Sequence, residues 1–460
     1  MRFPGLFEAL STDPALEEAT AAVAQPGATQ LDLTAVGAFF PVVTAALAGA
    51  GRTLLVVTST YREAEQLTDE LGTWLGEDEV VYYPAWETLP HERLSPRADT
   101  VGRRLAALRR IASDEPPACV VAPVRSVLQP QVKGLSRMRP VTITAGEEYP
   151  LTDLLEALLD AAYVRVDMVE RRGEFAVRGG IVDVFPPTAQ HPVRFDFFGD
   201  DVDEIRTFHV ADQRSTGDVL DEVVAAPCRE LLLTDDVRAR ARDLAAEHPE
   251  LADMLGRIAE GQAVDGMEAL IPVLVDGLEL LVDVLPARSL VLGIAPELLR
   301  TRAGELVATS REFLDASWAA AAGGGTSPID LDASAYRELD DVRDHALAIG
   351  HGWWQLSPFQ ADAGDGVLHL DAAPTEEFRG NAETAMAHVA ERVAAGWRVV
   401  LMVEGRGLAQ RLVELCGEHG IRATSGELER APEPGHVTVV VGGAHSGRSA
   451  ERPRRELLAT

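Results

Sequence analysis

The chain reads Tyr163-Val-Arg-Val-Asp-Met-Val-Glu-Arg-Arg-Gly-Glu-Phe-Ala-Val-Arg-Gly-Gly-Ile-Val-Asp-Val-Phe-Pro-Pro187, and a second run reads Val193-Arg-Phe-Asp-Phe-Phe-Gly-Asp-Asp-Val-Asp-Glu-Ile-Arg206. Apolar and polar side chains alternate along both runs, which is typical of strands with one face on a core. Gly179-Gly180 and Gly199-Asp200 interrupt the alternation and indicate turns. The two runs therefore predict a small sheet with one buried face and one free face.

The free face of this sheet carries charged and aromatic side chains. Arginine and aromatic residues supply much of the binding energy at protein interfaces, so one interpretation is a surface that docks a protein partner. The alternative is a solvated face whose arginines pair with Glu174, Asp183 or Asp196 and add little stability. The residues that would form the partner surface are Arg165, Arg178, Phe185, Arg194 and Asp196.

The same runs contain a long motif. Residues 172–186 read Arg-Gly-Glu-Phe-x-x-Arg-Gly-x-x-x-Asp-x-Phe-Pro, and residues 194–200 read Arg-Phe-Asp-Phe-Phe-Gly-Asp. This pattern resembles domain 2 of the UvrB and transcription-repair coupling factor families. Upstream, Tyr83-Pro-Ala-Trp-Glu-Thr-Leu-Pro90 and Leu94-Ser-Pro96 are similar to the coupling factor rather than to UvrB. The resemblance runs from the N-terminus to about Val441.

The resemblance implies a partner. In UvrB, arginines at the positions of Arg165, Arg178 and Arg194 contact UvrA, the damage-sensing ATPase, so UvrA is the expected partner of this chain. UvrB has one more arginine where this chain has Ala176, a departure that bears on the strength of the contact.

The chain divides into several expected units of an α/β protein. Strand and helix patterns alternate in the first part, which predicts a doubly wound parallel sheet. With the resemblance, the units are a degenerate RecA-like domain 1a at 1–140, an inserted α+β UvrA-binding domain 2 at 141–228, a mostly helical domain 1b with a return strand at 229–345, a linker at 346–364, and a small, incomplete α/β domain 3 at 365–460.

Composition limits the functions that are open to the chain. It has 42 Lys and Arg against 73 Asp and Glu, a net charge of −31, which disfavours a chain-wide phosphate-binding surface. Three cysteines stand far apart, without metal-ligand spacing, as expected in a reducing cytoplasm. The apolar tract from Leu270 to Leu285 is broken by Asp276, Glu279 and Asp283, so no membrane span is predicted.

A RecA-like sheet raises the expectation of ATP hydrolysis, which requires a glycine-rich loop ending in Gly-Lys-Ser/Thr. Lys133 is the only lysine, and it precedes a glycine instead of following one. The resemblance places the phosphate loop at Val36-Gly-Ala-Phe-Phe-Pro41 and the metal-binding carboxylates after Leu290-Val-Leu292, where Gly293-Ile294 follow. We therefore expect no ATPase activity, no cofactor and no metal in this chain. ATP and Mg²⁺ would belong to the motor domains of the intact family protein.

A local basic run stands out in this acidic chain. Leu105, Leu108 and Ile111 give it the inward stripe of a helix, and its cations would form a solvated helix face or a phosphate-contacting patch. His91-Glu92 lacks a second histidine at ligand spacing, and Trp353-Trp354 would pin the linker onto a domain surface. The residues of the possible phosphate patch are Arg103, Arg104, Arg109 and Arg110.

The tail from Ala444 onward departs from the family pattern and lacks apolar strands. We expect a chain that stops, or changes frame, before the polymerase-binding and DNA translocase domains of the family. The resemblance implies the UvrB-like module of a transcription-repair coupling factor, which recruits UvrA to stalled transcription complexes; RNA polymerase and DNA would be contacted by the intact protein. The alternatives are a UvrB-type ATPase or helicase and a nonspecific DNA-binding module.

Overall fold

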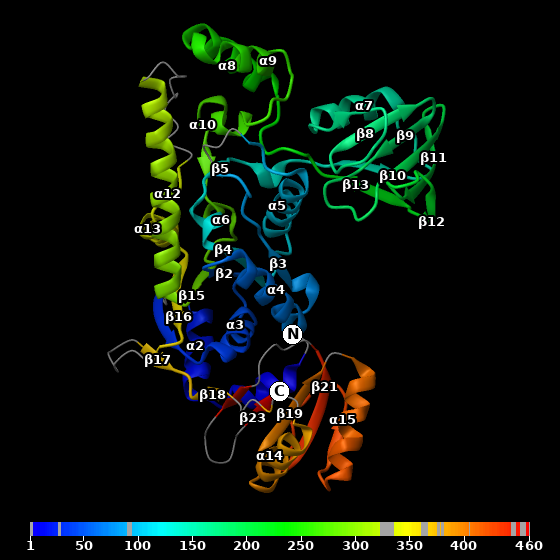
Figure 1. Cartoon of the computed structure of the whole chain (residues 1–460). Coiled ribbons are helices and arrows are strands. Elements are labelled where there is room, and N and C mark those ends of the chain that lie inside the picture. The colour runs from blue at the N-terminus through cyan, green and yellow to red at the C-terminus, as the bar shows by residue number, and fades with distance from the viewer. Residues whose placement is uncertain are drawn as a thin grey trace.

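The structure is a computed structural model, and its units are arranged around a central parallel sheet (Figure 1). The second unit lies to one side of this sheet, the helical unit at one end and the C-terminal unit at the other. Among the described residues, no helix is both long enough and apolar enough to cross a bilayer. The structure describes residues 3–25, 29–89, 94–322, 335–359, 367–374, 378, 381–403, 405–442, 448–450 and 457–459.

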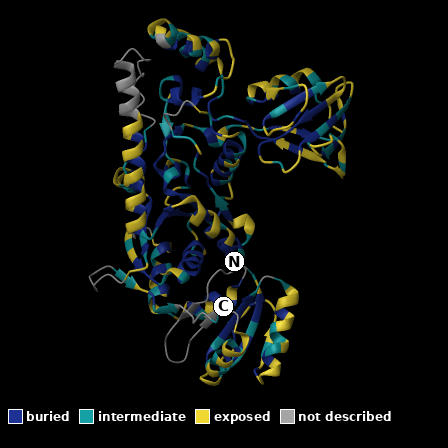
Figure 2. Ribbon diagram, in the orientation of Figure 1, coloured by how far each residue is buried: buried dark blue, intermediate teal, exposed yellow. Residues whose placement is uncertain are grey.

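The central sheet has seven strands in the order β17-β1-β16-β15-β2-β4-β3, and every neighbouring pair is parallel. Its inner strands are continuous apolar runs buried on both faces, as parallel sheets require (Figure 2). The strands are β1 (Gln30–Thr34), β2 (Leu54–Thr58), β3 (Val80–Tyr82), β4 (Cys119–Pro123), β15 (Leu290–Ile294), β16 (Gly352–Ser357) and β17 (Val367–His369).

Helices cover both faces of this sheet, so it is doubly wound as predicted. One core holds Leu54 and Val56 of β2, and the other holds Leu55 and Val57, because successive strand residues point to opposite faces. The first core is covered by α1 (Pro4–Leu10), α2 (Pro14–Ala24), α3 (Phe40–Ala48) and α4 (Tyr61–Leu75). The second is covered by α5 (Ala98–Ile111), α6 (Val124–Leu128), α11 (Leu281–Val284), α12 (Pro296–Ala322) and α13 (Leu339–Ala348).

The expected linker at 346–364 is wrong, because it contains an interior strand of the central sheet. β16 lies between β1 and β15, with Trp353 buried in one core and Trp354 in the other. The tryptophans therefore do not pin a linker; they fill both layers of the sheet. Burial of neighbouring aromatic residues on opposite faces is a strand property. β17, at the start of the expected domain 3, also joins this sheet.

The second unit forms a six-stranded sheet in the order β12-β11-β10-β9-β8-β7, in which neighbours from β8 to β12 are antiparallel. Helix α7 (Leu151–Asp160) packs Leu154 and Leu158 onto one face. The strands are β7 (Val164–Arg165), β8 (Glu174–Arg178), β9 (Ile181–Val184), β10 (Val193–Phe198), β11 (Asp201–Phe208) and β12 (Ser215–Val219). Strands β6 (Val141–Thr144) and β13 (Glu222–Ala225) pair where the unit begins and ends.

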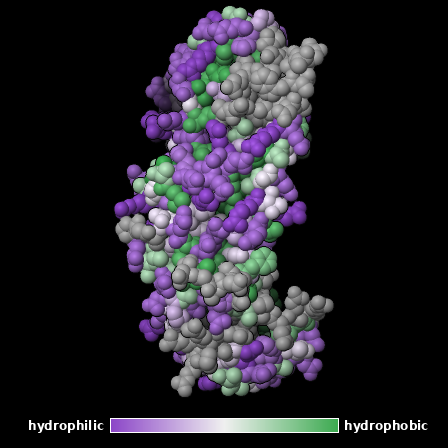
Figure 3. Space-filling model, turned by 90° about the vertical axis from the view of Figure 1, so that its left-hand side faces the viewer, coloured by the Kyte–Doolittle hydropathy of each residue, from purple (hydrophilic) through white to green (hydrophobic). Residues whose placement is uncertain are grey.

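The helical unit follows the second unit in the chain and begins with α8 (Asp235–Glu247). Its core joins α8, α9 (Ala252–Ala259) and α10 (Ile271–Leu274) with Trp86 of the first unit. Strand β14 (Leu278–Glu279) pairs with β5 (Gln131–Val132), which ties the helical unit back to the first. The face of the molecule that carries α12 is largely hydrophilic, with scattered apolar side chains, in keeping with the acidic composition (Figure 3).

The C-terminal unit contains a second sheet, in the order β18-β22-β23-β19-β21-β20, with α14 (Ala382–Ala394) and α15 (Arg406–Glu418). The expectation that the tail adds no strands is wrong, because β22 and β23 pair with β18 and β19 through backbone hydrogen bonds. Helix α1 reaches this unit, since Gly5 N–H donates to the Leu428 carbonyl at 2.7 Å. The strands are β18 (Ala372–Pro374), β19 (Arg398–Val403), β20 (Ala423–Ser425), β21 (His436–Val441), β22 (Arg448–Ala450) and β23 (Leu457–Ala459).

Candidate partner-binding surface

The sheet of the second unit has one face on the α7 core and one face turned away from it. Val182, Val184 and Phe195 belong to the core face, so the residues between them lie on the open face. The strand register aligns the open-face residues in two rows of cross-strand neighbours, Ala176-Asp183-Arg194-Arg206 and Arg178-Ile181-Asp196-Glu204.

Arg194 is held by its own sheet. Its Nε and Nη2 donate to the two carboxylate oxygens of Asp183 at 2.6 and 2.8 Å, and its guanidinium lies 4.9 Å from the centre of the Phe208 ring. The hydrogen bonds to Asp183 raise the pKa of Arg194. Asp183 is buried, Arg194 is 19% exposed, and its Nη1 donates to the Gln213 carbonyl at 3.5 Å, so this bidentate pair fixes the centre of the open face. The intramolecular pairing considered as the alternative is thus found here.

Asp196 belongs to a second, more exposed pair. Its carboxylate accepts from Arg206 Nη2 at 3.2 Å, and the same nitrogen lies 2.6 Å from Glu204. All three side chains remain partly exposed. Since exposed ion pairs contribute little stability, the charges of this row stay accessible to a partner.

Arg178 and Arg165 are the exposed cations among the predicted surface residues. Arg178 ends β8, just before the β8–β9 turn, and its Nη2 donates to the Asp167 carbonyl at 2.8 Å. Gly179 in the turn has φ of +64°, a left-handed conformation that glycine adopts without strain. Arg165 lies in β7, at the edge of the sheet.

Phe185 is buried, which contradicts its assignment to the partner surface. Its ring packs with Val169, Ala176 and Phe208 in a small core on this same face, which the loop containing Val169 covers. The guanidinium of Arg172 lies 5.0 Å from the ring centre and covers it. Strand alternation places Phe185 on the same face as Asp183. It does not show that a loop covers this part of the face.

Two exposed apolar residues of this sheet were not predicted as part of the surface. Ile181 is the cross-strand neighbour of Arg178 and is 36% exposed. Phe198, at the β10–β11 turn, is 82% exposed. A signal existed for Phe198, because the Phe-Phe-Gly sequence breaks the alternation just before the turn. Arginine and aromatic residues are enriched at protein interfaces.

The predicted phosphate patch is not a single surface. Arg103 is exposed, Arg109 and Arg110 are half-buried, and Arg110 donates to Ser113 and to the Asp78 carbonyl. Burial lowers the pKa of Arg109. Arg104 is completely buried, so it cannot contact a phosphate from solvent.

Arg104 instead forms a buried ion pair with Glu230, in the segment that follows domain 2. Its Nε lies 2.5 Å from Glu230 Oε1, and both side chains are fully buried. Trp86 Nε1 donates to the same oxygen at 2.9 Å, and Arg104 Nη1 donates to the Pro84 carbonyl at 2.8 Å. Burial alone would lower the pKa of Arg104, but the Glu230 carboxylate raises it overall. The pair joins α5 to the first residues beyond domain 2.

The carboxyl edge of the central sheet carries a cavity of about 400 Å³ at residues 36–41, the position expected for a phosphate loop. Gly37–Phe39 form a short 3-10 helix there, and Phe40 and Pro41 line the cavity. Glu63 and Glu70 line the opposite wall. Among the described residues, no lysine or arginine borders this cavity.

Comparison with known proteins places this chain in a family. Residues 141–230 match the model of the UvrB interaction domain. The transcription-repair-coupling factor of Mycobacterium tuberculosis is 47% identical over 430 residues, 88% of this chain and 34% of that protein. The chain belongs to the transcription-repair-coupling factor family. The family protein of Myxococcus xanthus is 36% identical over 53% of this chain, and that of Bacillus subtilis 34% identical over 44%. The chain spans about a third of the length of the Mycobacterium relative.

Proposed function

We propose that this chain is a docking module that binds UvrA through the open face of domain 2, and that it recruits UvrA to stalled transcription complexes in the intact coupling factor. The match of residues 141–230 to the UvrB interaction domain supports the assignment of the surface to this domain. The observation that carries it is the exposed Arg178, next to exposed Ile181 and beside the pre-formed Arg194–Asp183 pair.

The surface is organised for binding with little reordering. The bidentate pair holds the centre of the face, so a partner meets a fixed arrangement of charges and loses less conformational freedom on association. Arg178 can then reach a carboxylate of the partner, while Ile181 supplies apolar area next to it. Asp196 extends the same surface in this proposal, whereas Arg165 is the register partner of the core-face Phe175 and lies at the β7 edge of the sheet, outside the open face.

The work of this chain is binding, not turnover. The cavity at the expected nucleotide position is bordered by carboxylates, which repel a triphosphate, and by Phe40 and Pro41, which occupy space near its loop. ATP, Mg²⁺, RNA polymerase and DNA belong to the remainder of the family protein in this proposal, and the expected location is the cytoplasm. An ATPase assay on the purified chain should give no rate above that of buffer. A measurable rate would favour the UvrB-type ATPase instead.

The test of the docking surface is charge reversal at Arg178. Arg178→Glu should abolish capture of purified UvrA, because a carboxylate would face the group that the guanidinium binds. The matched control is Arg214→Glu, the same charge change at an exposed position of domain 2 outside the two rows. If both variants capture UvrA as the unchanged protein does, the assigned surface is wrong.

A further inference from the structure

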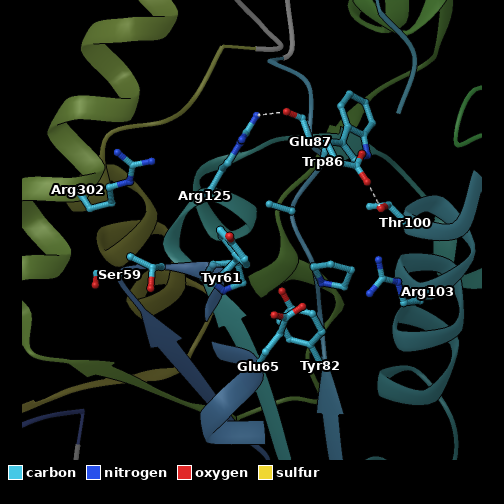
Figure 4. A pocket seen from close by; sticks show the side chains of 14 residues that line it. Ser59, Tyr61, Glu65, Tyr82, Trp86, Glu87, Thr100, Arg103, Arg125 and Arg302 are labelled. Atoms are coloured by element: carbon cyan, nitrogen blue, oxygen red, sulfur yellow. Dashed lines mark hydrogen bonds between the residues drawn. The ribbon is translucent and has the colours of Figure 1, made fainter. Parts of the chain in front are cut away.

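A second cavity lies at the same edge of the central sheet, where β2, β3 and β4 end. It has a volume of about 440 Å³ and opens outside the carboxyl ends of β2, β3 and β4. Crevices at the carboxyl ends of parallel strands are where doubly wound sheets bind ligands. Figure 4 shows the side chains that line it, which come from the sheet edge and from α4, α5, α6 and α12.

Three guanidinium groups border this cavity. Arg103 comes from α5, Arg125 from α6 and Arg302 from α12. Arg125 is held in place, because its Nε donates to Tyr336 Oη at 2.8 Å and its Nη2 to the Thr88 carbonyl at 2.6 Å. Arg103 and Arg302 are about half exposed and form exposed ion pairs with Asp99 at 3.8 Å and Glu305 at 2.9 Å, which contribute little stability, so both can be exchanged for contacts with a ligand.

The walls between these cations are aromatic. Tyr61, Tyr82 and Trp86 all line the cavity, and Tyr61 is 59% exposed. Burial and then Glu65 raise the pKa of Tyr82 to about 12, so its hydroxyl stays protonated and neutral at physiological pH. The Trp86 N–H is bonded to Glu230, which fixes the indole. Flat rings beside guanidinium groups are suited to stacking on a planar base.

Two carboxylates also border the cavity and reduce its positive charge. Glu87 accepts from the Thr100 hydroxyl and from the backbone N–H of Arg97, so part of its hydrogen-bonding capacity is already used. Three arginines against Glu65 and Glu87 leave a formal charge of 3 − 2 = +1, whereas the whole chain carries −31. Anion-binding capacity is therefore found in this cavity and not in the acidic cavity beside Phe40.

We propose that this cavity binds a nucleotide, either free or as one residue of a single-stranded nucleic acid, without a metal ion and without hydrolysis. The guanidinium groups of Arg103 and Arg302 lie on opposite sides of the cavity (Figure 4), so each would meet the nucleotide from its own side, and the base would stack against the rings of Tyr61 and Tyr82 between them. The volume falls in the range of small-molecule sites, about 300–1,000 Å³. The proposal does not depend on the Arg178 surface, which lies in another domain.

The test is a titration of the full chain, by calorimetry and by tryptophan fluorescence, with adenosine monophosphate, a short oligothymidylate and inorganic phosphate. We expect the nucleotide, the oligonucleotide or both to bind; binding of the mononucleotide assigns the free ligand, and binding of the oligonucleotide alone assigns the single strand. Arg103→Glu and Arg302→Glu should each weaken binding by about tenfold or more, the usual loss for a hydrogen bond to a charged group. Tyr82→Leu should weaken nucleotide binding and leave that of inorganic phosphate unchanged.

The matched control is Arg137→Glu with Arg139→Glu, two exposed arginines outside the cavity, which should bind as the unchanged chain does. Circular dichroism checks that each variant is folded. The proposal is overturned if neither probe binds at millimolar concentration, if the cavity variants bind as tightly as the control, or if inorganic phosphate binds as tightly as the nucleotide.

Discussion

Replacing Glu230 by glutamine tests the joint between domain 2 and the central sheet. Glu230 and Arg104 are both fully buried, so the substitution leaves a guanidinium in the interior without its counter-charge. Removal of one partner from a buried ion pair costs about 3–5 kcal/mol. Gln131 Oε1, 3.3 Å from Arg104 Nη2, and the Pro84 carbonyl remain as neutral acceptors, which cannot offset the lost charge.

The assay is thermal unfolding followed by circular dichroism. At about 2–4 °C per kcal/mol for a unit of this size, Glu230→Gln should lower the midpoint by about 6–20 °C. The double variant Arg104→Met with Glu230→Leu should recover most of this loss, because it removes both charges and fills the space with apolar groups. The control is Glu305→Gln, which breaks an exposed pair with Arg302 and should cost at most about 1 kcal/mol. The reasoning is refuted if Glu230→Gln shifts the midpoint no more than this control does.

Gly102→Ala should destabilise the chain by about 1–3 kcal/mol in thermal unfolding, because the new Cβ would lie 2.4 Å from Pro187 Cβ where α5 meets domain 2. The control, Gly304→Ala, places its Cβ in open space on α12 and should be neutral or stabilising by up to about 1 kcal/mol. Equal effects of the two substitutions would contradict the contact with Pro187. Burial raises the pKa of Tyr82 from 10.0 to about 12, so the neutral phenol stabilises the fold below pH 10, and this stability is lost as the pH rises toward 12. Tyr82→Phe should therefore reduce the fall of the thermal unfolding midpoint between pH 10 and 12. Burial raises the pKa values of three thiols, those of Cys119, Cys228 and Cys416. None of them should react with Ellman's reagent before the chain unfolds. A reaction with the folded chain would place a thiol at the surface.

Much of the fold follows from local patterns in the sequence. The apolar run of β2 predicted a buried parallel strand, and the helix expected from Tyr61 to Trp74 is α4, closed at its start by the Thr60–Glu63 capping box. The alternation in 163–208 predicted the domain 2 sheet and its open face. These signals succeed because each depends on residues close together in the chain.

Other features depended on contacts between distant residues. Arg104 stands among exposed-looking arginines on α5, and only the return of Glu230 from domain 2 explains its burial. Phe185 is covered by Arg172, and the strand at Trp353 is recognised as interior only once β1 and β15 lie on either side of it. The cavity that holds Arg103, Arg125 and Arg302 brings α12 against α4, α5 and α6, which lie far from it in the sequence, so no local motif could have indicated it.

The order of the central strands bears on how the protein is made. β1 pairs only with β16 and β17 in the part of the chain that the structure describes, and about 320 residues separate its last residue, Thr34, from the start of β16 at Gly352. At about 5–20 residues per second, a ribosome needs roughly 16–64 s to supply that neighbour. Throughout this interval β1, once outside the exit tunnel, lacks both of the strands with which it pairs in the described part of the chain. A chaperone that shelters the nascent chain would be needed most during that wait.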